Sequence, residues 1–278
     1  MVSRALQAPF RKLLWIMVVA VTSIIIFYFF YSPLHAKEHK ACLAPVDLIR
    51  FKALTPTLER VFKSGDRVRI AALGSSSTQG AGASSKELRY PAQLQAELQR
   101  RFPDSDIEVA NLGIGGELAS DMLKRVDGQV LPLKPALVIW QTGVNDAIRG
   151  VDLEEFRSTL QKGIRLFKEQ GIDVVLLDHQ YYPGAAKLAG FDDYLQALHD
   201  MAREENIPLL SRYRIMEHLV TTGQFAISDL LARDRFHLND VSYGCLGTAM
   251  ADALENSVRH RPVQSAAPVP VTLVKGSN

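Results

Sequence analysis

The chain has 278 residues, 47% of them hydrophobic, which is enough for one α/β domain with a full core. A second large domain is not expected. Its formal net charge is only +2, and the three charged residues within positions 1–36 are all basic, so the rest of the chain carries a net charge of −1. This balance gives no electrostatic reason to expect nucleic acid as a partner.

The first predicted element is a membrane-spanning helix. Residues 13–32 contain no charged side chain over twenty positions, about the length of a helix that crosses a bilayer, and Pro33 ends the segment. Aromatic residues crowd its C-terminal end, and basic residues precede it. We therefore expect residues 1–36 to form an inner-membrane anchor with a cytoplasmic N-terminus. Everything after Pro33 would then be periplasmic or otherwise extracytoplasmic.

A cleaved signal peptide ending near Ala36, followed by secretion, is the alternative for this segment. The apolar part of a signal peptide is typically about 7 to 15 residues long, shorter than the segment here, and Leu34 is large for the position three residues before a cleavage site. A retained anchor is favoured.

The chain has two cysteines, Cys42 just after the predicted anchor and Cys245 late in the sequence. In an oxidising compartment the pair can form a disulfide. Two unconnected buried thiols are an equal alternative, because free cysteine is among the most buried residue types.

After the anchor we expect a connector, one folded domain and a tail. Residues 37–66 mix polar and apolar residues with two prolines and are expected to pack on the domain at 67–261, whereas residues 262–278 lack any period and are expected to be disordered. Hydrophobic patterns within the domain alternate between strand and helix. The predicted strands are 67–73, 106–113, 136–143, 173–182 and 207–213. The predicted helices are 90–102, 118–126, 153–171, 191–206 and 242–260.

This alternation predicts an α/β fold: a doubly wound, flavodoxin-like sheet of five parallel strands with helices on both faces. Trp140 lies in an apolar strand and is expected in the core. In such folds ligands bind at the carboxyl ends of the strands, so the segments that follow the strands are the candidates for a site.

A turn of small residues, 74–82, follows the first predicted strand and includes Ser75, Ser76 and Ser77. A hydroxyl at this edge of the sheet can be exposed and nucleophilic. By itself the segment is more typical of a flexible Ser/Gly loop, and no Gly-Lys-Ser/Thr follows that would make it a phosphate-binding loop.

The second and third strands end in segments rich in glycine and asparagine, residues 111–116 and 141–146. Glycine lets backbone N–H groups approach a ligand, and the Asn145 side chain adds an amide donor. Each segment alone could equally be an ordinary strand-to-helix turn.

Asp234 and His237 stand three residues apart before the last predicted helix. That spacing can bring the carboxylate to the imidazole Nδ1–H, which leaves Nε2 free to accept a proton from a serine. A surface Asp/His pair without function is the commoner case for such a spacing taken alone.

Together and in this order, the four segments resemble the SGNH/GDSL hydrolase family over residues 67–260. The resemblance implies that Ser76 is the nucleophile, that Asp234 and His237 complete the triad, and that Ser76, Gly116 and Asn145 form the oxyanion hole. Two departures are visible, because Ser75 stands where the signature usually has Asp and Val144 where it often has Thr. Neither position belongs to the triad.

The function implied by the resemblance is ester hydrolysis through an acyl-enzyme on Ser76. An O-acyltransferase with the same triad, and a non-catalytic envelope-binding protein with the same fold, are the alternatives. The substrate is expected to be an ester, such as an acylated glycan or a lipid. His179, Tyr181 and Tyr182 end the fourth predicted strand and either line the substrate cleft or pack at its edge. Since the sequence holds no HExxH or CxxC motif, we expect no metal and no cofactor.

Overall fold

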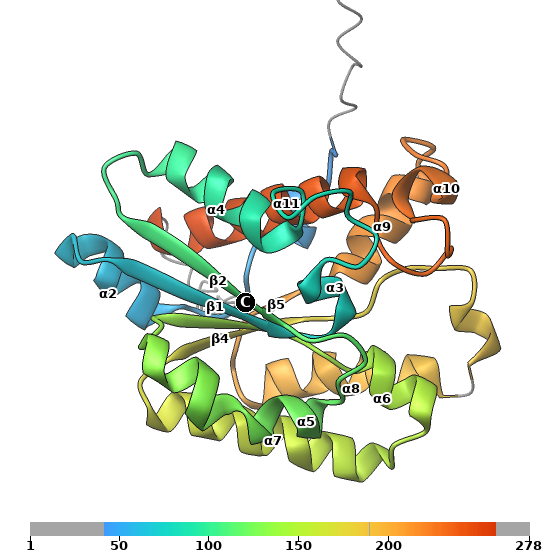
Figure 1. Ribbon diagram of the computed structural model, residues 1–278, viewed down its shortest axis with the longest axis horizontal. Coiled ribbons are helices and arrows are strands. Elements are labelled where there is room, and N and C mark those ends of the chain that lie inside the picture. Colours follow the sequence, from blue (N-terminus) through green and yellow to red (C-terminus); the bar gives the residue numbers. More distant parts are fainter. Residues whose placement is uncertain (1–41, 189, 260–278) are drawn as a thin grey trace, which may run out of the picture. The chain divides into compact units, whose positions relative to one another are not determined.

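A computed structural model describes residues 42–188 and 190–259 (Figure 1). The predicted membrane segment at 13–32 and the predicted tail at 262–278 lie outside these ranges. Among the described residues, no helix is both long and apolar enough to cross a bilayer.

Five parallel strands form one sheet within the described part of the chain, in the order β2-β1-β3-β4-β5. The strands are β1 (Val68–Gly74), β2 (Ile107–Gly113), β3 (Leu137–Gln141), β4 (Asp173–Leu177) and β5 (Leu209–Leu210). This is the flavodoxin-like order, in which the chain starts at an inner strand, β1, moves to the adjacent edge with β2 and then continues on the other side of β1 to the opposite edge. The predicted five-stranded parallel α/β sheet is confirmed.

Helices cover both faces of the sheet. The longer ones are α2 (Pro56–Ser64), α4 (Tyr90–Arg101), α7 (Leu153–Glu169), α8 (Phe191–Glu204), α9 (Arg212–Thr221) and α11 (Asp240–Arg259). The shorter ones are α3 (Ser76–Gln79), α5 (Ala119–Lys124), α6 (Val144–Arg149) and α10 (Ile227–Leu230), with single turns at Val46–Leu48, Val126–Val130, Leu131–Leu133 and Ala185–Lys187. Helices α4 and α11 lie on one face, and α5, α7 and α8 lie on the other (Figure 1).

The core lies between these layers. Strand β3 is buried along its whole length, because it is paired on both edges and covered on both faces. Trp140 is fully buried and donates its indole N–H to the Met122 sulfur, so the prediction of a core tryptophan is confirmed. Phe51 and Leu58, from the segment that we predicted as a connector, belong to the same hydrophobic core.

Strands β4 and β5 are shortened most relative to the prediction. Strand β4 ends at Leu177 rather than at residue 182, because its outer neighbour β5 pairs only through Leu209 and Leu210. Strand β5 in turn ends where the Ser211 hydroxyl caps α9 by accepting from the Arg214 N–H. Apolar residues beyond these points pack in loops, and hydrophobicity alone cannot distinguish a buried loop from a strand.

A disulfide joins Cys42 to Cys245 across 203 residues of sequence and ties the start of the described chain to helix α11. Because the bridge closes most of the domain into a loop, it restricts the unfolded chain strongly. The chain-entropy model gives an upper limit of about 5 kcal/mol for a loop of this size.

We predict that replacing both cysteines by serine lowers the free energy of unfolding by a few kcal/mol. The measurement is denaturant unfolding of the double variant beside the oxidised and the reduced wild type. Reduced wild type should match the variant and not the oxidised protein. Equal unfolding midpoints for all three samples would rule out a stabilising bridge.

Candidate active site

Four segments that are far apart in sequence meet at the carboxyl edge of the sheet. Three follow strands β1, β2 and β3, and the fourth, residues 231–238, precedes α11. Because the strands are parallel and adjacent, their C-terminal ends lie side by side.

Only Ser76 of the three consecutive serines reaches the surface. Strand β1 ends at Gly74, and the chain turns at once into the one-turn helix α3, which begins at Ser76. Ser75 is 4% exposed and Ser77 is 3% exposed, whereas Ser76 is half-buried. Burial therefore singles out Ser76 as the accessible hydroxyl.

A buried glutamine fixes the backbone in front of Ser76. The Gln141 side-chain oxygen accepts from the Ser75 N–H at 3.1 Å and from the Thr78 hydroxyl at 3.1 Å. These bonds hold both ends of the turn that presents Ser76. Sequence reasoning missed this residue, although a polar side chain at the end of an otherwise apolar strand is a signal that could have found it.

Ser76, His237 and Asp234 form one hydrogen-bonded row. The Ser76 Oγ lies 2.9 Å from the His237 Nε2, and the His237 Nδ1 lies 2.5 Å from the Asp234 Oδ2. With the Nδ1–H donating to the carboxylate, the Nε2 lone pair faces the serine hydroxyl. The structure thus brings together the three residues that the sequence assigned to a triad.

Asp234 is held ionised by its own turn. Partial burial acts to raise the pKa of Asp234, but the hydrogen bond from His237 and the backbone N–H groups of Phe236 and His237 outweigh it, so the pKa lies below its usual value. Both N–H groups donate to Oδ1 at 3.0 Å, which leaves Oδ2 for the imidazole. These bonds favour the ionised form of Asp234 beside the imidazole of His237.

Direct contacts pin the serine loop to the histidine loop. Gly82 approaches the histidine segment so closely that an added Cβ would lie 2.3 Å from the Leu238 carbonyl oxygen, and its φ of +90° also requires glycine. The Asp240 carboxylate accepts from the N–H and the hydroxyl of Ser84 at 2.8 and 2.7 Å. The Tyr243 hydroxyl donates to the Ala81 carbonyl at 2.7 Å. These contacts set the Ser76–His237 distance.

The second and third strand ends supply the opposite side of the site. The segment 113–117, which we call the glycine loop, lies against α3, and a Cβ added to Gly115 would lie 3.9 Å from the Ser76 Cβ. At Gly116, with φ of +80°, an added Cβ would meet only the Arg149 guanidinium. Gly115 is thus shown to pack near Ser76, while the N–H donor expected at Gly116 stays a prediction.

Three hydrogen bonds fasten the glycine loop and the start of α5 to helix α6. The Asn145 side-chain amide donates to the Glu117 carbonyl at 2.8 Å, and Arg149 donates to the Gly116 carbonyl at 2.9 Å. The buried Asp146 carboxylate accepts from the Ala119 N–H at 3.1 Å. An amide nitrogen carries two N–H groups, so Asn145 keeps one more donor for a ligand.

The buried position of Asp146 affects its acidity. Burial raises its pKa, and hydrogen bonds from the Ala119, Asp146 and Gly143 backbones and the Thr142 side chain oppose that shift only in part. Asp146 was not assigned a role from the sequence, and the structure makes it the acceptor that caps the start of α5.

Of the two alternatives for His179 and Tyr182, lining the substrate cleft or buried packing, the burial of both side chains favours packing. His179 is fully buried, and desolvation, with smaller effects of Arg212 and His199, lowers its pKa to about 3. Tyr182 is 7% exposed and stacks edge-on against Phe236, whose ring in turn contacts the His237 ring. Tyr182 thus supports the His237 ring through Phe236, while His179 packs in the interior against Phe191. Tyr181 is half-buried against Tyr213, and its contact with substrate stays a prediction.

No cluster of three or more histidine, cysteine or carboxylate side chains that could hold a metal ion occurs in the described ranges.

Comparison with known proteins assigns a family to residues 41–260, which match the model of the non-GDSL lipase-like family. The match covers more than half of the chain and includes residues 41–66 of the predicted connector. The replacement of the signature aspartate by Ser75 agrees with that description.

Individual relatives are esterases. An arylesterase of Vibrio mimicus is 27% identical over 146 residues, which is 50% of this chain and 72% of the relative. An acetylxylan esterase of Geobacillus stearothermophilus is 26% identical over 161 residues, 53% of this chain and 72% of the relative. Among solved structures, a two-domain esterase active on acetylated mannans superimposes with a TM-score of 0.66 at 25% identity over 82% of this chain. The match spans 60% of that esterase.

We predict that Gly113→Ala damages the site, because a Cβ there would lie 2.0 Å from the Gln79 backbone nitrogen and would push α3 away. Overpacking of this kind typically costs about 1 to 3 kcal/mol and here also displaces Ser76. Gly128→Ala is the control, since an added Cβ there meets nothing within 4 Å. Thermal unfolding and ester hydrolysis measure both effects, and equal behaviour of the two variants would contradict the close packing.

Proposed function

Because the chain belongs to the non-GDSL lipase-like family, within the SGNH hydrolases, we propose that it hydrolyses carboxylic esters through an acyl-enzyme on Ser76. The observation that carries the proposal is the row from Ser76 Oγ through His237 to Asp234, with distances of 2.9 and 2.5 Å. A serine in this arrangement can lose its proton to the imidazole as it attacks.

The first half of the reaction forms the acyl-enzyme. The Ser76 oxygen attacks the ester carbonyl carbon while His237 Nε2 takes the hydroxyl proton, and Asp234 stabilises the imidazolium that results. The carbonyl oxygen becomes an oxyanion, and we assign the Ser76 N–H, the Gly116 N–H and the Asn145 side chain as the donors that stabilise it. Collapse of this intermediate breaks the ester C–O bond, and His237 returns its proton to the departing alcohol.

The second half releases the acid. A water molecule gives its proton to His237 and attacks the acyl carbon, and the second tetrahedral intermediate expels the Ser76 oxygen. The histidine returns the proton to Ser76. The overall change is ester plus water to acid plus alcohol, with the enzyme restored.

Acetyl esters of glycans are the substrate class that we propose. Two of the relatives described above, from Geobacillus stearothermophilus and among the solved structures, act on acetylated xylan and acetylated mannans. The site itself is open, since Asp234 is 49% exposed. An open site beside the sheet edge suits a short acyl group on a bulky alcohol, whereas a long acyl chain needs a deep apolar pocket.

We also propose that residues 13–32 hold the enzyme at the inner membrane with the hydrolase domain in the periplasm. The support is the uncharged length of this segment and the basic residues before it.

The anchor predicts that the full chain fractionates with membranes, resists extraction by carbonate and keeps its N-terminus. Cell fractionation and N-terminal sequencing measure these properties. A mature form that begins near Lys37 in a soluble fraction would show a cleaved signal instead.

For the triad, we predict that Ser76→Ala abolishes hydrolysis of p-nitrophenyl acetate, whereas Ser77→Ala, its buried neighbour, keeps most of it. Asp234→Asn should lower kcat by about 10⁴, because the amide favours the wrong histidine tautomer. Asn145→Ala should cost about 10² to 10³ in kcat, because it removes one oxyanion donor. Circular dichroism checks folding. Undiminished hydrolysis by folded Ser76→Ala would overturn the proposal.

A further inference from the structure

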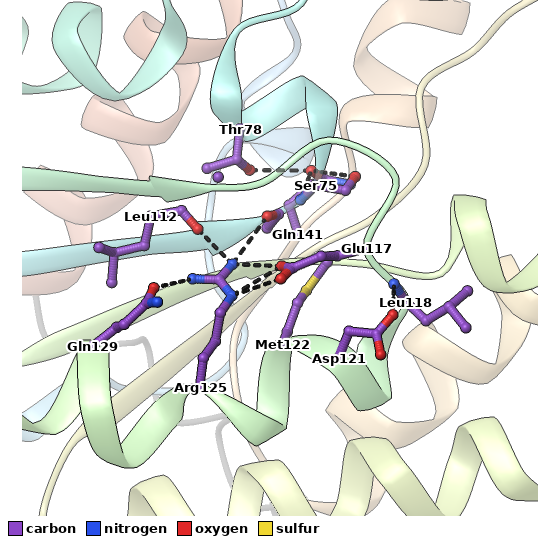
Figure 2. Close-up of polar contacts among 12 residues, drawn as sticks. Ser75, Thr78, Leu112, Glu117, Leu118, Asp121, Met122, Arg125, Gln129 and Gln141 are labelled. Carbon is purple, nitrogen blue, oxygen red and sulfur yellow. Dashed lines mark hydrogen bonds and ion pairs between the residues drawn. The ribbon is translucent and has the colours of Figure 1, made fainter.

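An ion pair between Arg125 and Glu117 lies beneath the glycine loop (Figure 2). The Arg125 Nε lies 3.0 and 2.9 Å from the two Glu117 carboxylate oxygens, and its Nη2 lies 2.7 Å from Oε2. The two side chains are only 9% and 14% exposed. Such a two-pronged contact fixes both groups in one orientation.

The same guanidinium also holds the ends of two strands. Its Nη2 donates to the Leu112 carbonyl at 2.6 Å and to the Gly74 carbonyl at 3.4 Å, while Nη1 donates to the Gln129 side chain (Figure 2). Gly74 ends β1 directly before the serines, and Leu112 directly precedes the glycine loop. One side chain therefore ties the nucleophile strand, the strand before the glycine loop and the loop's last residue together.

Glu117 passes this constraint on to Asn145. Its carboxylate is held by Arg125, and its backbone carbonyl accepts the Asn145 amide at 2.8 Å. A shift of Glu117 would therefore move the Asn145 side chain as well as Gly115 and Gly116. Because carboxylate and guanidinium neutralise each other, the effect on the site is one of geometry.

We propose that Arg125 is a positioning residue of this enzyme: through Glu117, Leu112 and Gly74 it holds the glycine loop and Asn145 in the arrangement that receives the oxyanion. The proposal rests on the proposed ester hydrolysis. Preorganised donors stabilise the transition state more than the bound substrate, so loosening them lowers kcat more than it changes KM. Lysine cannot replace this fork of donors, because its ammonium is a point charge on a flexible stem.

The test compares Arg125→Met with Arg101→Met in the full chain. Arg101 is a matched control: it is 7% exposed and pairs with carboxylates of Glu97, Asp252 and Glu255, on α4 and α11, away from the triad. Both variants are expected to unfold at lower temperature. Only Arg125→Met should lose kcat for p-nitrophenyl acetate, by about 10- to 100-fold, with KM changed less than threefold.

Arg125→Lys and Glu117→Gln change the side-chain volume little. They replace Arg125→Met in the test if that variant does not fold. Each is expected to lower kcat, and the double variant Glu117→Gln with Arg125→Met should lose no more than Arg125→Met alone, because both act on one loop. Wild-type kcat in the folded Arg125 variants, or equal loss of kcat in the Arg101 control, would overturn the proposal.

Hydrogen exchange of the amides in residues 113–117 tests the same point without activity. Exchange should be faster in Arg125→Met and unchanged in Arg101→Met, and equal rates in both would overturn the positioning proposal. Failure of the proposed function shows differently, as ester hydrolysis that survives in Ser76→Ala.

Discussion

The site depends on one hydrogen bond, between Ser76 Oγ and His237 Nε2, which joins residues 161 positions apart. Nothing local in the sequence can set this distance. It follows from the end of β1 on one side and from the loop before α11 on the other, and these are tied together by the Ser84–Asp240 and Tyr243–Ala81 contacts. The glycine at position 82, with its close approach to Leu238, lets the two loops touch. The α/β sheet thus serves as the frame that delivers a hydroxyl and an imidazole to each other.

The opposite side of the site, formed by the glycine loop and helix α6, is held in place by side-chain hydrogen bonds. Its proposed donors come from the glycine loop and from the first turn of the short helix α6, so hydrogen bonds to neighbouring segments supply much of its rigidity. Asn145, Asp146 and Arg149 fasten α6 to residues 116–119, while Arg125 holds the Glu117 carboxylate. Burial makes the bonds of Asn145, Asp146 and Arg125 expensive to break, because an unpaired charge or amide would remain in a poorly solvated place, whereas the Arg149 bond is exposed.

Much of this arrangement was predictable from the sequence, and the exceptions depend on contacts between residues that are distant in sequence. Strands β1, β2 and β3 and helices α4, α7 and α11 follow clear hydrophobic periods, and the motifs at the strand ends are correct in order and place. The early ends of β4 and β5, and the burial of His179 and Tyr182, depend on how little of β5 pairs with its neighbour. Arg125 was missed because it binds backbone groups distant in sequence, which no spacing rule reports. Gln141 was missed although its place, as a polar residue at the end of an apolar strand, was a usable signal.

The central claim is that Ser76 is the nucleophile activated by His237. The most direct measurement is peptide mass spectrometry of the full-length protein after treatment with a fluorophosphonate, which forms a stable adduct only with an activated serine. The adduct is expected on Ser76 alone, at one per chain, and it should be lost in His237→Ala. An adduct on Ser75 or Ser77, or full labelling of His237→Ala, would contradict the account.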